Sequence, residues 1–228
     1  MNNGEEKKSV KDCSSTVGNN REDSDNTRSF QFDIYDPKRL AALSDGIFAI
    51  VMTLLILDLK FPFVANTTSG ELHRQLWGNL PKFRGFVVSF FLLAVFWIIN
   101  HYHFKYIKRM DSKLLWINMV YLLLVCCLPF TTNLSSDYHN LWLPQVMFSG
   151  NIFLIRILAN LNWWYATKNR RFVDPDLSMG IISSTSKLGL LAVVIYFIAF
   201  LSALLHHYSP IIYLAIPLIL FMFRYKRK

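Results

Sequence analysis

Long apolar segments alternate with short polar connections along most of the chain, and this pattern predicts six membrane-spanning helices. A helix needs about 20 predominantly apolar residues to cross a bilayer. Most of the chain from residue 37 onward falls into segments of roughly that length. We therefore predict an all-α, polytopic membrane protein. The six predicted spans cover residues 37–61, 81–104, 112–132, 143–166, 183–206 and 209–223.

Polar residues at the ends of the segments support these boundaries. Asp36 directly precedes Pro37, which suits a capping residue followed by the first helical position. Asp111 precedes the third span in the same way. The stretches 64–79 and 133–142 are polar and are predicted to be loops.

The first 33 residues have a different composition from the rest. They are rich in Asn, Ser, Asp, Glu and Lys and nearly lack large apolar side chains, which predicts a disordered tail. They also lack the apolar core of a signal peptide. The chain is thus predicted to consist of a tail, residues 1–33, and one membrane domain, residues 34–228.

Composition and charge agree with a membrane protein. The chain is 53% hydrophobic with a mean hydropathy of +0.30, which excludes an ordinary soluble domain. The net charge of +9 could indicate nucleic-acid binding, but the Lys and Arg residues lie between apolar segments, so we predict no nucleic-acid partner. They gather in the tail, in the connections after the second and fourth spans, and at the C-terminus. This distribution predicts a multi-pass protein of the cell membrane with both termini in the cytoplasm.

The first span carries an aliphatic stripe and an acidic residue on different faces. At about 100° per residue, Leu54 and Leu57 lie within about 40° of Ile50. Thr53 flanks this stripe, whereas Asp45 lies about 140° away from it. Packing against lipid or against the protein core is the default interpretation of the stripe. Asp45 is expected to point into the protein and to have a structural role, because ionisable groups in membranes normally find partners.

Further polar residues near the cytoplasmic side could join Asp45. Arg39 is six residues away and cannot form an ordinary i,i+4 pair with it, so Arg39 is a candidate for contacts between helices or subunits. His101 and Asn118, near the cytoplasmic ends of the second and third spans, could complete a hydrogen-bonded network. His101 and His103 face different sides of a helix and have no Cys or Glu cluster nearby, so no metal site is predicted.

Arg156 lies near the middle of the fourth span and should face protein or a water-filled cavity. A structural pair is the default interpretation, and a ligand or anion site is the alternative. Cys126 and Cys127 are expected to be buried free thiols. The chain has no Thr-Val-Gly-Tyr-Gly filter, no phosphate-binding glycine loop and no nucleophile with a plausible base. We therefore predict neither enzyme activity nor a cofactor.

Motifs in the first three spans resemble those of a known family. The family's hallmark is Arg, three residues, and then Phe-Ser-Asp before a short aliphatic helix; here Leu43 stands in place of Phe. The residues that carry the resemblance are Arg39, Leu43-Ser44-Asp45 and Ile50 in the first span, Phe96, Trp97 and His101 in the second, and Leu114 to Phe130 in the third. Over residues 37–132 the chain resembles the prokaryotic relatives of transmembrane protein 175, the potassium channel of endosomes and lysosomes.

The resemblance implies six helices per chain, a homotetramer and a central pore lined by the first helix. Ile50, Leu54 and Leu57 would then form constriction rings in a potassium-permeable cation channel, with Thr53 as a candidate for selectivity. The structural polar network that braces this helix would consist of Arg39, Ser44, Asp45, His101 and Asn118.

Other interpretations stay open. Asp58, near the outer end of the first span, could form an acidic ring at the outer mouth or pair with Lys60. A membrane transporter or proton-coupled carrier would instead use Asp45, His101 and Arg156, and a structural membrane protein would give no flux. The predicted partners are potassium ions, other monovalent cations or protons, together with the lipid bilayer and further copies of the chain.

Overall fold

The computed structural model describes residues 35–57, 59 and 68–205, and this part of the chain forms helices without an extended strand. The all-α prediction is therefore confirmed for these residues. The elements are α1 (Pro37–Leu57), α2 (Ser69–Gly78), α3 (Leu80–Tyr106), α4 (Ser112–Cys126), α5 (Leu128–Asp137), α6 (Trp142–Thr167), the short 3-10 helix η1 (Lys168–Arg170) and α7 (Met179–Leu204).

Five described helical segments are long and apolar enough to cross a membrane, and they correspond to the first five predicted spans. The third of them combines α4 and α5. The sixth predicted span, the tail over residues 1–33 and Asp58 lie outside the described residues. The segments are Pro37–Leu57, Leu80–Tyr106, Ser112–Asp137, Trp142–Arg170 and Met179–Leu204.

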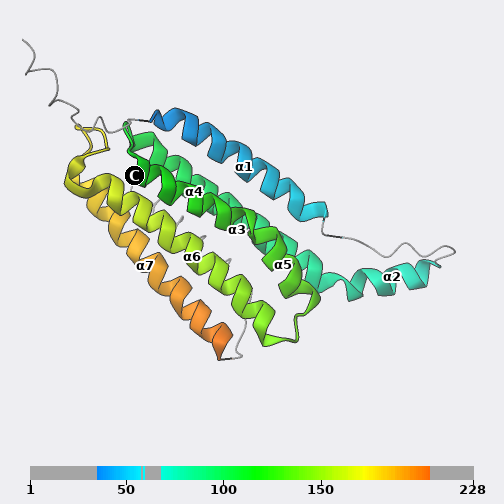
Figure 1. The fold of residues 1–228 in the computed structure, drawn as a ribbon. Coiled ribbons are helices and arrows are strands. Elements are labelled where there is room, and N and C mark those ends of the chain that lie inside the picture. The colour runs from blue at the N-terminus through cyan, green and yellow to red at the C-terminus, as the bar shows by residue number, and fades with distance from the viewer. Residues whose placement is uncertain (1–34, 58, 60–67, 206–228) are drawn as a thin grey trace, which may run out of the picture. The chain divides into compact units, whose positions relative to one another are not determined.

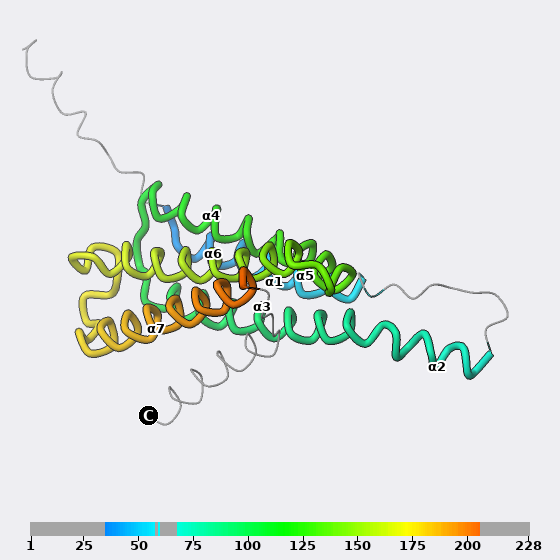
Figure 2. The backbone as a smooth tube through the Cα atoms, turned by 90° about the horizontal axis from the view of Figure 1, so that it is seen from below, coloured from blue at the N-terminus to red at the C-terminus, as the bar shows by residue number. Residues whose placement is uncertain are grey.

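The spanning helices lie side by side in a bundle (Figure 1). α1 packs on α3 and α4, α6 packs on both α4 and α7, and α5 contacts α3 and α6. α2 instead continues beyond the start of α3, away from the other helices (Figure 2). A buried apolar cluster fills the middle of the bundle, and its members include Leu92, Phe96, Tyr121, Ile152 and Tyr196.

The predicted starts of the first and third spans are confirmed. The backbone N–H of Lys38 donates to Asp36 Oδ1 at 2.9 Å, just before α1. The backbone N–H of Leu114 donates to Asp111 Oδ1 at 2.9 Å, at the start of α4. Asp111 Oδ2 also accepts the hydroxyl of Tyr165 at 2.7 Å. This one carboxylate therefore caps α4 and ties it to α6.

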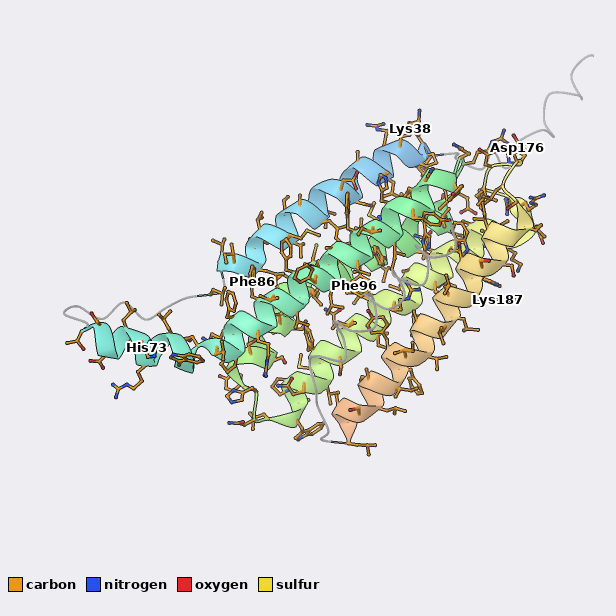
Figure 3. All side chains as sticks on the ribbon, turned by 180° about the vertical axis from the view of Figure 1, so that it is seen from behind. Lys38, His73, Phe86, Phe96, Asp176 and Lys187 are labelled. Atoms are coloured by element: carbon orange, nitrogen blue, oxygen red, sulfur yellow. The ribbon has the colours of Figure 1, made fainter. Side chains whose placement is uncertain are left out.

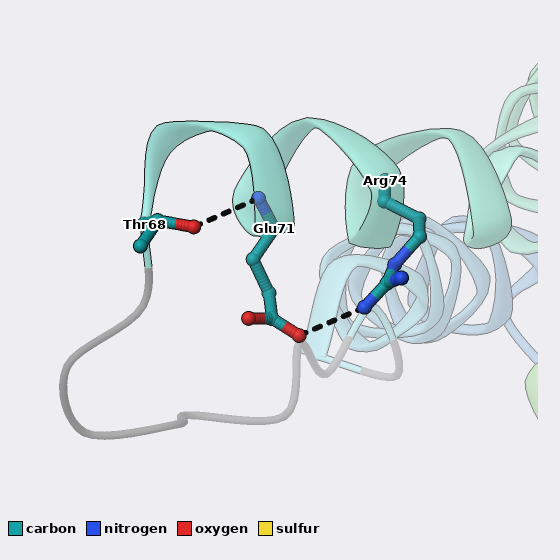
Figure 4. A network of polar contacts seen from close by, with 3 residues as sticks. All are labelled: Thr68, Glu71 and Arg74. Carbon is teal, nitrogen blue, oxygen red and sulfur yellow. Dashed lines mark hydrogen bonds and ion pairs between the residues drawn. The ribbon is translucent and has the colours of Figure 1, made fainter.

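The prediction of a loop over residues 64–79 is wrong for Ser69–Gly78, which forms α2. The backbone N–H of Glu71 donates to Thr68 Oγ1 at 3.3 Å, and Arg74 Nη2 donates to Glu71 Oε1 at 2.9 Å (Figure 4). A Thr followed three residues later by Glu is the pattern of a capping box. The hydrophobic pattern does not reveal this helix because the segment is too polar to be a span.

The third predicted span starts correctly, but its end is wrong. A break at Cys127 separates α4 from α5 (Leu128–Asp137), which extends into the predicted loop 133–142. Pro129 lies in the first turn of α5, where a proline is tolerated but cannot continue the hydrogen-bond ladder of a preceding helix. Cys126 and Cys127, expected to be buried, are exposed on the single subunit. A thiol behaves as a small apolar group and can face lipid without a partner.

The connections α3–α4 and α6–α7 close one end of the bundle together. The backbone N–H of Lys108 donates to the carbonyl oxygen of Phe172 at 2.8 Å, which joins the two connections directly. Lys38 of α1 and Asp176 lie at this same end, and His73 of α2 lies at the opposite end (Figure 3).

Replacing Asp111 with Ala is expected to lower the free energy of unfolding by about 1–3 kcal/mol, because α4 loses its cap and the Tyr165 hydroxyl loses its acceptor. Thermal unfolding of the purified protein in detergent measures the change. Asp176→Ala, which removes an exposed carboxylate at the same end, is the matched control. Equal losses of stability in the two variants would contradict the role assigned to Asp111.

Candidate functional site

In a single subunit, one face of α1 packs on the protein and another is bare. The buried face consists of Leu40, Ser44, Phe48, Val51 and Leu55, with Pro37 at the start. The predicted stripe lies on the bare face, where Ile50, Leu54 and Leu57 are 59%, 43% and 64% exposed. The stripe therefore does not belong to the core of the subunit. The rest of the described residues leave it uncovered.

The hydroxyl groups of α1 are satisfied within the helix. Thr53 is exposed, and its Oγ1 donates to the carbonyl oxygen of Ile50 at 2.7 Å. Ser44 is fully buried, and its hydroxyl donates to the carbonyl oxygen of Leu40 at 2.9 Å. Such bonds to the preceding turn are common for Ser and Thr in helices. Ser44 therefore adds a small side chain to the packed face without a described bond to another helix.

Asp45 connects α1 to α3 through Trp97. Its Oδ1 accepts the indole N–H of Trp97 at 2.8 Å. Asp45 is nevertheless exposed among the described residues, so the prediction that it points into the protein is wrong there; its position beside α3 lets Trp97 reach it from the helix surface. The ring of His101 packs on Trp97 one turn further along α3, with ring centroids 5.7 Å apart and planes at 35°. We call Asp45, Trp97 and His101 the α1–α3 cluster. No hydrogen bond between Asp45 and His101 is found among the described residues, so Trp97 stands between them.

The sequence analysis named Trp97 as a motif residue but gave it no role at the site. It precedes His101 by four residues, which places both side chains on one face of a helix. A tryptophan in a membrane span also carries an N–H that needs an acceptor when it leaves water. These two facts together are the signal that could have identified it.

Asn118 and Arg39 are not joined to the α1–α3 cluster by described bonds. Asn118 is fully buried in α4, and neither its Nδ2 nor its Oδ1 has a hydrogen-bond partner among the described residues. Arg39 is exposed, and its guanidinium has no described partner in residues 35–57, 59 and 68–205. The predicted polar residues therefore do not form one continuous network within a single subunit.

The two histidines of α3 face different sides, as predicted. His101 is exposed, whereas His103 is buried and stacks on Trp163 of α6, with ring centroids 4.8 Å apart. His103 thus belongs to the packing between α3 and α6.

Arg156 of α6 lies inside the subunit, as expected for a charged residue in the middle of a span. It is 7% exposed, and its Nη2 donates to the carbonyl oxygen of Gly189 on α7 at 3.4 Å. Its described hydrogen bond therefore leads to α7 and not to the α1–α3 cluster.

Comparison with known proteins assigns this arrangement to a family. The model of the family described as the endosomal/lysosomal potassium channel TMEM175 matches residues 39–129. A protein of Streptomyces collinus named as a potassium channel is 30% identical over 141 residues, which are 60% of this chain and 68% of that relative. The chain belongs to the TMEM175 family. A second relative, a protein of Chamaesiphon minutus named as a potassium channel, is 29% identical over 167 residues, which are 71% of this chain and 81% of the relative.

The fold agrees with a solved TMEM175 structure. The crystal structure of a lysosomal potassium-selective channel TMEM175 homologue from Chamaesiphon minutus superposes with a TM-score of 0.69 at 25% identity. The match covers 84% of this chain and 97% of that chain. The human relative, named the endosomal/lysosomal proton channel TMEM175, is 29% identical over 147 residues, which are 59% of this chain and 29% of the human protein.

The region that matches the TMEM175 family model contains the α1–α3 cluster and Asn118. It starts at Arg39 and ends at Pro129, so it covers most of α1 and all of α3 and α4. Arg156 and the α6–α7 contact lie beyond it. The exposed face of α1 thus lies within residues 39–129, which match the family model, and Arg156 lies outside them.

Trp97→Phe removes the indole N–H and keeps an aromatic ring beside His101. In a double-mutant cycle with Asp45→Ala, we expect a coupling energy of about 1 kcal/mol, because each variant removes the same hydrogen bond. The free energies of unfolding of the four proteins give this value. Trp116→Phe is the control, since Trp116 is 68% exposed on α4 and should not couple to Asp45. The same coupling for both tryptophans, or none for Trp97, would contradict the assigned bond.

Proposed function

We propose that the protein is a potassium-permeable cation channel in which copies of α1 from a homotetramer surround a central pore. Membership of the TMEM175 family and the names of the two bacterial relatives support this proposal. The observation that carries it is the bare aliphatic face of α1, formed by Ile50, Leu54 and Leu57. A pore helix needs such a face, because its other side must pack on its own subunit.

The proposed gate works through the wetting of the pore. Rings of Ile50, Leu54 and Leu57 would line successive levels of the channel. A narrow aliphatic ring excludes water and so blocks ions, and a small rotation or splay of the helices admits a hydrated or partly dehydrated cation. Thr53 lies beside the rings, and its hydroxyl oxygen can still accept or coordinate while its hydrogen is bonded to Ile50. Because the sequence has no carbonyl filter, selectivity among monovalent cations should be modest.

The polar residues would support the pore helix and not bind the ion. Asp45 holds α1 to α3 through Trp97, so its carboxylate is already engaged. Arg39 is exposed without a described partner, which suits a contact with a neighbouring subunit. Ser44 and Asn118 would contribute to the packing of α1 and α4 from inside the subunit.

The protein is a multi-pass membrane protein, and we place it in the cell membrane with both termini and the tail over residues 1–33 in the cytoplasm. The joined α3–α4 and α6–α7 connections are rich in cations, which favours the cytoplasmic side. Asp58 would then lie at the outer mouth, where an acidic ring attracts cations. The basic residues in these two connections and in the last turn of α3 are Lys105, Lys108, Arg109, Lys168, Arg170 and Arg171.

A proton-coupled carrier that uses Asp45, His101 and Arg156 is less well supported. Asp45 and His101 both contact Trp97, whereas the described hydrogen bond of Arg156 goes to Gly189. The channel therefore remains our conclusion. Because the human relative is named a proton channel, protons belong among the ions to be tested.

Ile50→Asn is expected to raise potassium leak roughly tenfold, because a polar side chain hydrates the constriction and lowers the barrier to a cation. Potassium, sodium and proton flux into liposomes containing the purified protein measure the effect. Unitary currents in planar bilayers separate a channel from a carrier, and the mass of the purified assembly tests the tetramer.

Ile198→Asn on α7 is the matched control. Ile198 is 59% exposed, as is Ile50, but it lies on a helix that the proposal places away from the pore. This variant should keep the flux of the unmodified protein. An equal rise in both variants, or no rise for Ile50→Asn, would overturn the assignment of α1 to the pore.

A further inference from the structure

Arg156 is a buried cation without a counter-charge among the described residues. Its side chain is 7% exposed, and neither Nε nor Nη1 has a hydrogen-bond partner in the part of the chain that the structure describes. Its bond to the Gly189 carbonyl, at 3.4 Å, is long for an N–H···O contact. An arginine keeps its proton in proteins, so losing the proton cannot remove the free-energy cost of burying this charge.

Among the described residues, no carboxylate is paired with this charge. α7, which packs on α6, contains no Asp or Glu. The acids in or next to the other spanning segments are Asp45 in the first half of α1, Asp111 at the cap of α4 and Asp137 at the end of α5. Each of them is already hydrogen-bonded or ion-paired elsewhere. Arg156, in contrast, lies in the middle of α6.

The groups around the guanidinium are polar but uncharged. Tyr121 of α4 and Tyr196 of α7 are close enough to interact electrostatically with Arg156. Asn160 Oδ1 lies against Gly189, where an added Cβ would collide with it unless the amide moved. Hydroxyl and amide groups can donate or accept hydrogen bonds, but they cannot neutralise a full charge.

Water alone would solve only half of this problem. It could complete the hydrogen bonds of Nε and Nη1, but the charge would remain in a low-dielectric interior, where an uncompensated ion is far more costly than an unmade hydrogen bond. We propose that each subunit holds a small monovalent anion of the halide class, such as chloride, at Nε and Nη1 of Arg156, between α4, α6 and α7. A monatomic anion needs the least space, and its single charge matches the single cation.

This anion would be a structural part of the subunit. It completes the core between α6 and α7, so binding stabilises the folded protein whether or not the pore conducts. The proposal therefore does not rest on the proposed channel function, and its test does not use ion flux.

The test compares the thermal unfolding of the full-length protein in lipid nanodiscs in potassium chloride and in potassium gluconate, at the same potassium concentration. Gluconate is too large for a halide site. We expect the unfolding temperature to be roughly 5 °C or more higher in chloride, once chloride is about 100 times its Kd. Potassium bromide should act like chloride. Arg156→Met should remove the difference between the salts.

Lys187→Gln separates a site at Arg156 from a general effect of surface charge. The side chain of Lys187, two residues before Gly189 on α7, points away from the helix bundle and is exposed (Figure 3). This variant also loses one positive charge, and it should keep the full difference between chloride and gluconate. A loss of the difference in Lys187→Gln as well would overturn the assignment to Arg156.

Bromide also gives a direct readout that needs no variant. Crystals of the unmodified protein grown in bromide should show an anomalous scattering peak beside the Arg156 guanidinium. This measurement decides the question if Arg156→Met does not fold. The same unfolding temperature in chloride and gluconate, or density for water alone beside Arg156, would overturn the proposal.

Discussion

Polar groups in a membrane-spanning helix must find their partners inside the protein, and much of this structure follows from that constraint. The hydroxyls of Ser44, Thr53 and Ser149 donate to carbonyl oxygens one turn earlier in their own helices. Ser89 and Thr132 pair with each other across α3 and α5 at 2.7 Å. A polar side chain that cannot be satisfied in its own helix must therefore join two helices or bind something else.

In α1, the polar attachment and the exposed aliphatic stripe occupy different parts of the helix. The polar attachment of α1 lies in its first half, where Asp45 meets Trp97 of α3. Beyond Thr53, the described contacts of α1 are apolar. Dispersion contacts are individually weak and tolerate small displacements better than a hydrogen bond does.

The contact between α6 and α7 buries a polar side chain whose bonds are not all made within the described residues. Small residues bring the two helices close, since a Cβ at Gly189 would meet Asn160 and one at Gly150 would meet Phe200. Close packing buries Arg156 and removes it from water. The energy of the buried cation therefore depends on which group bonds to its Nε and Nη1, which have no partner among the described residues. This half of the bundle lies beyond the region that matches the family model. Its stability therefore depends on contacts that the motifs of the first three spans do not describe.

The sequence by itself determined the properties that depend on near neighbours. Apolar length gave the first five spans, and Asp36 and Asp111 marked two helix starts. The tertiary structure decided the rest, because it depends on which helices lie side by side. Trp97 became the partner of Asp45 only when α3 packed on α1, and the described hydrogen bond of Arg156 goes to Gly189 because α7 packs on α6. The burial of a side chain and the choice of its hydrogen-bond partner depend on contacts between residues far apart in the sequence. A local pattern in the chain does not contain this information.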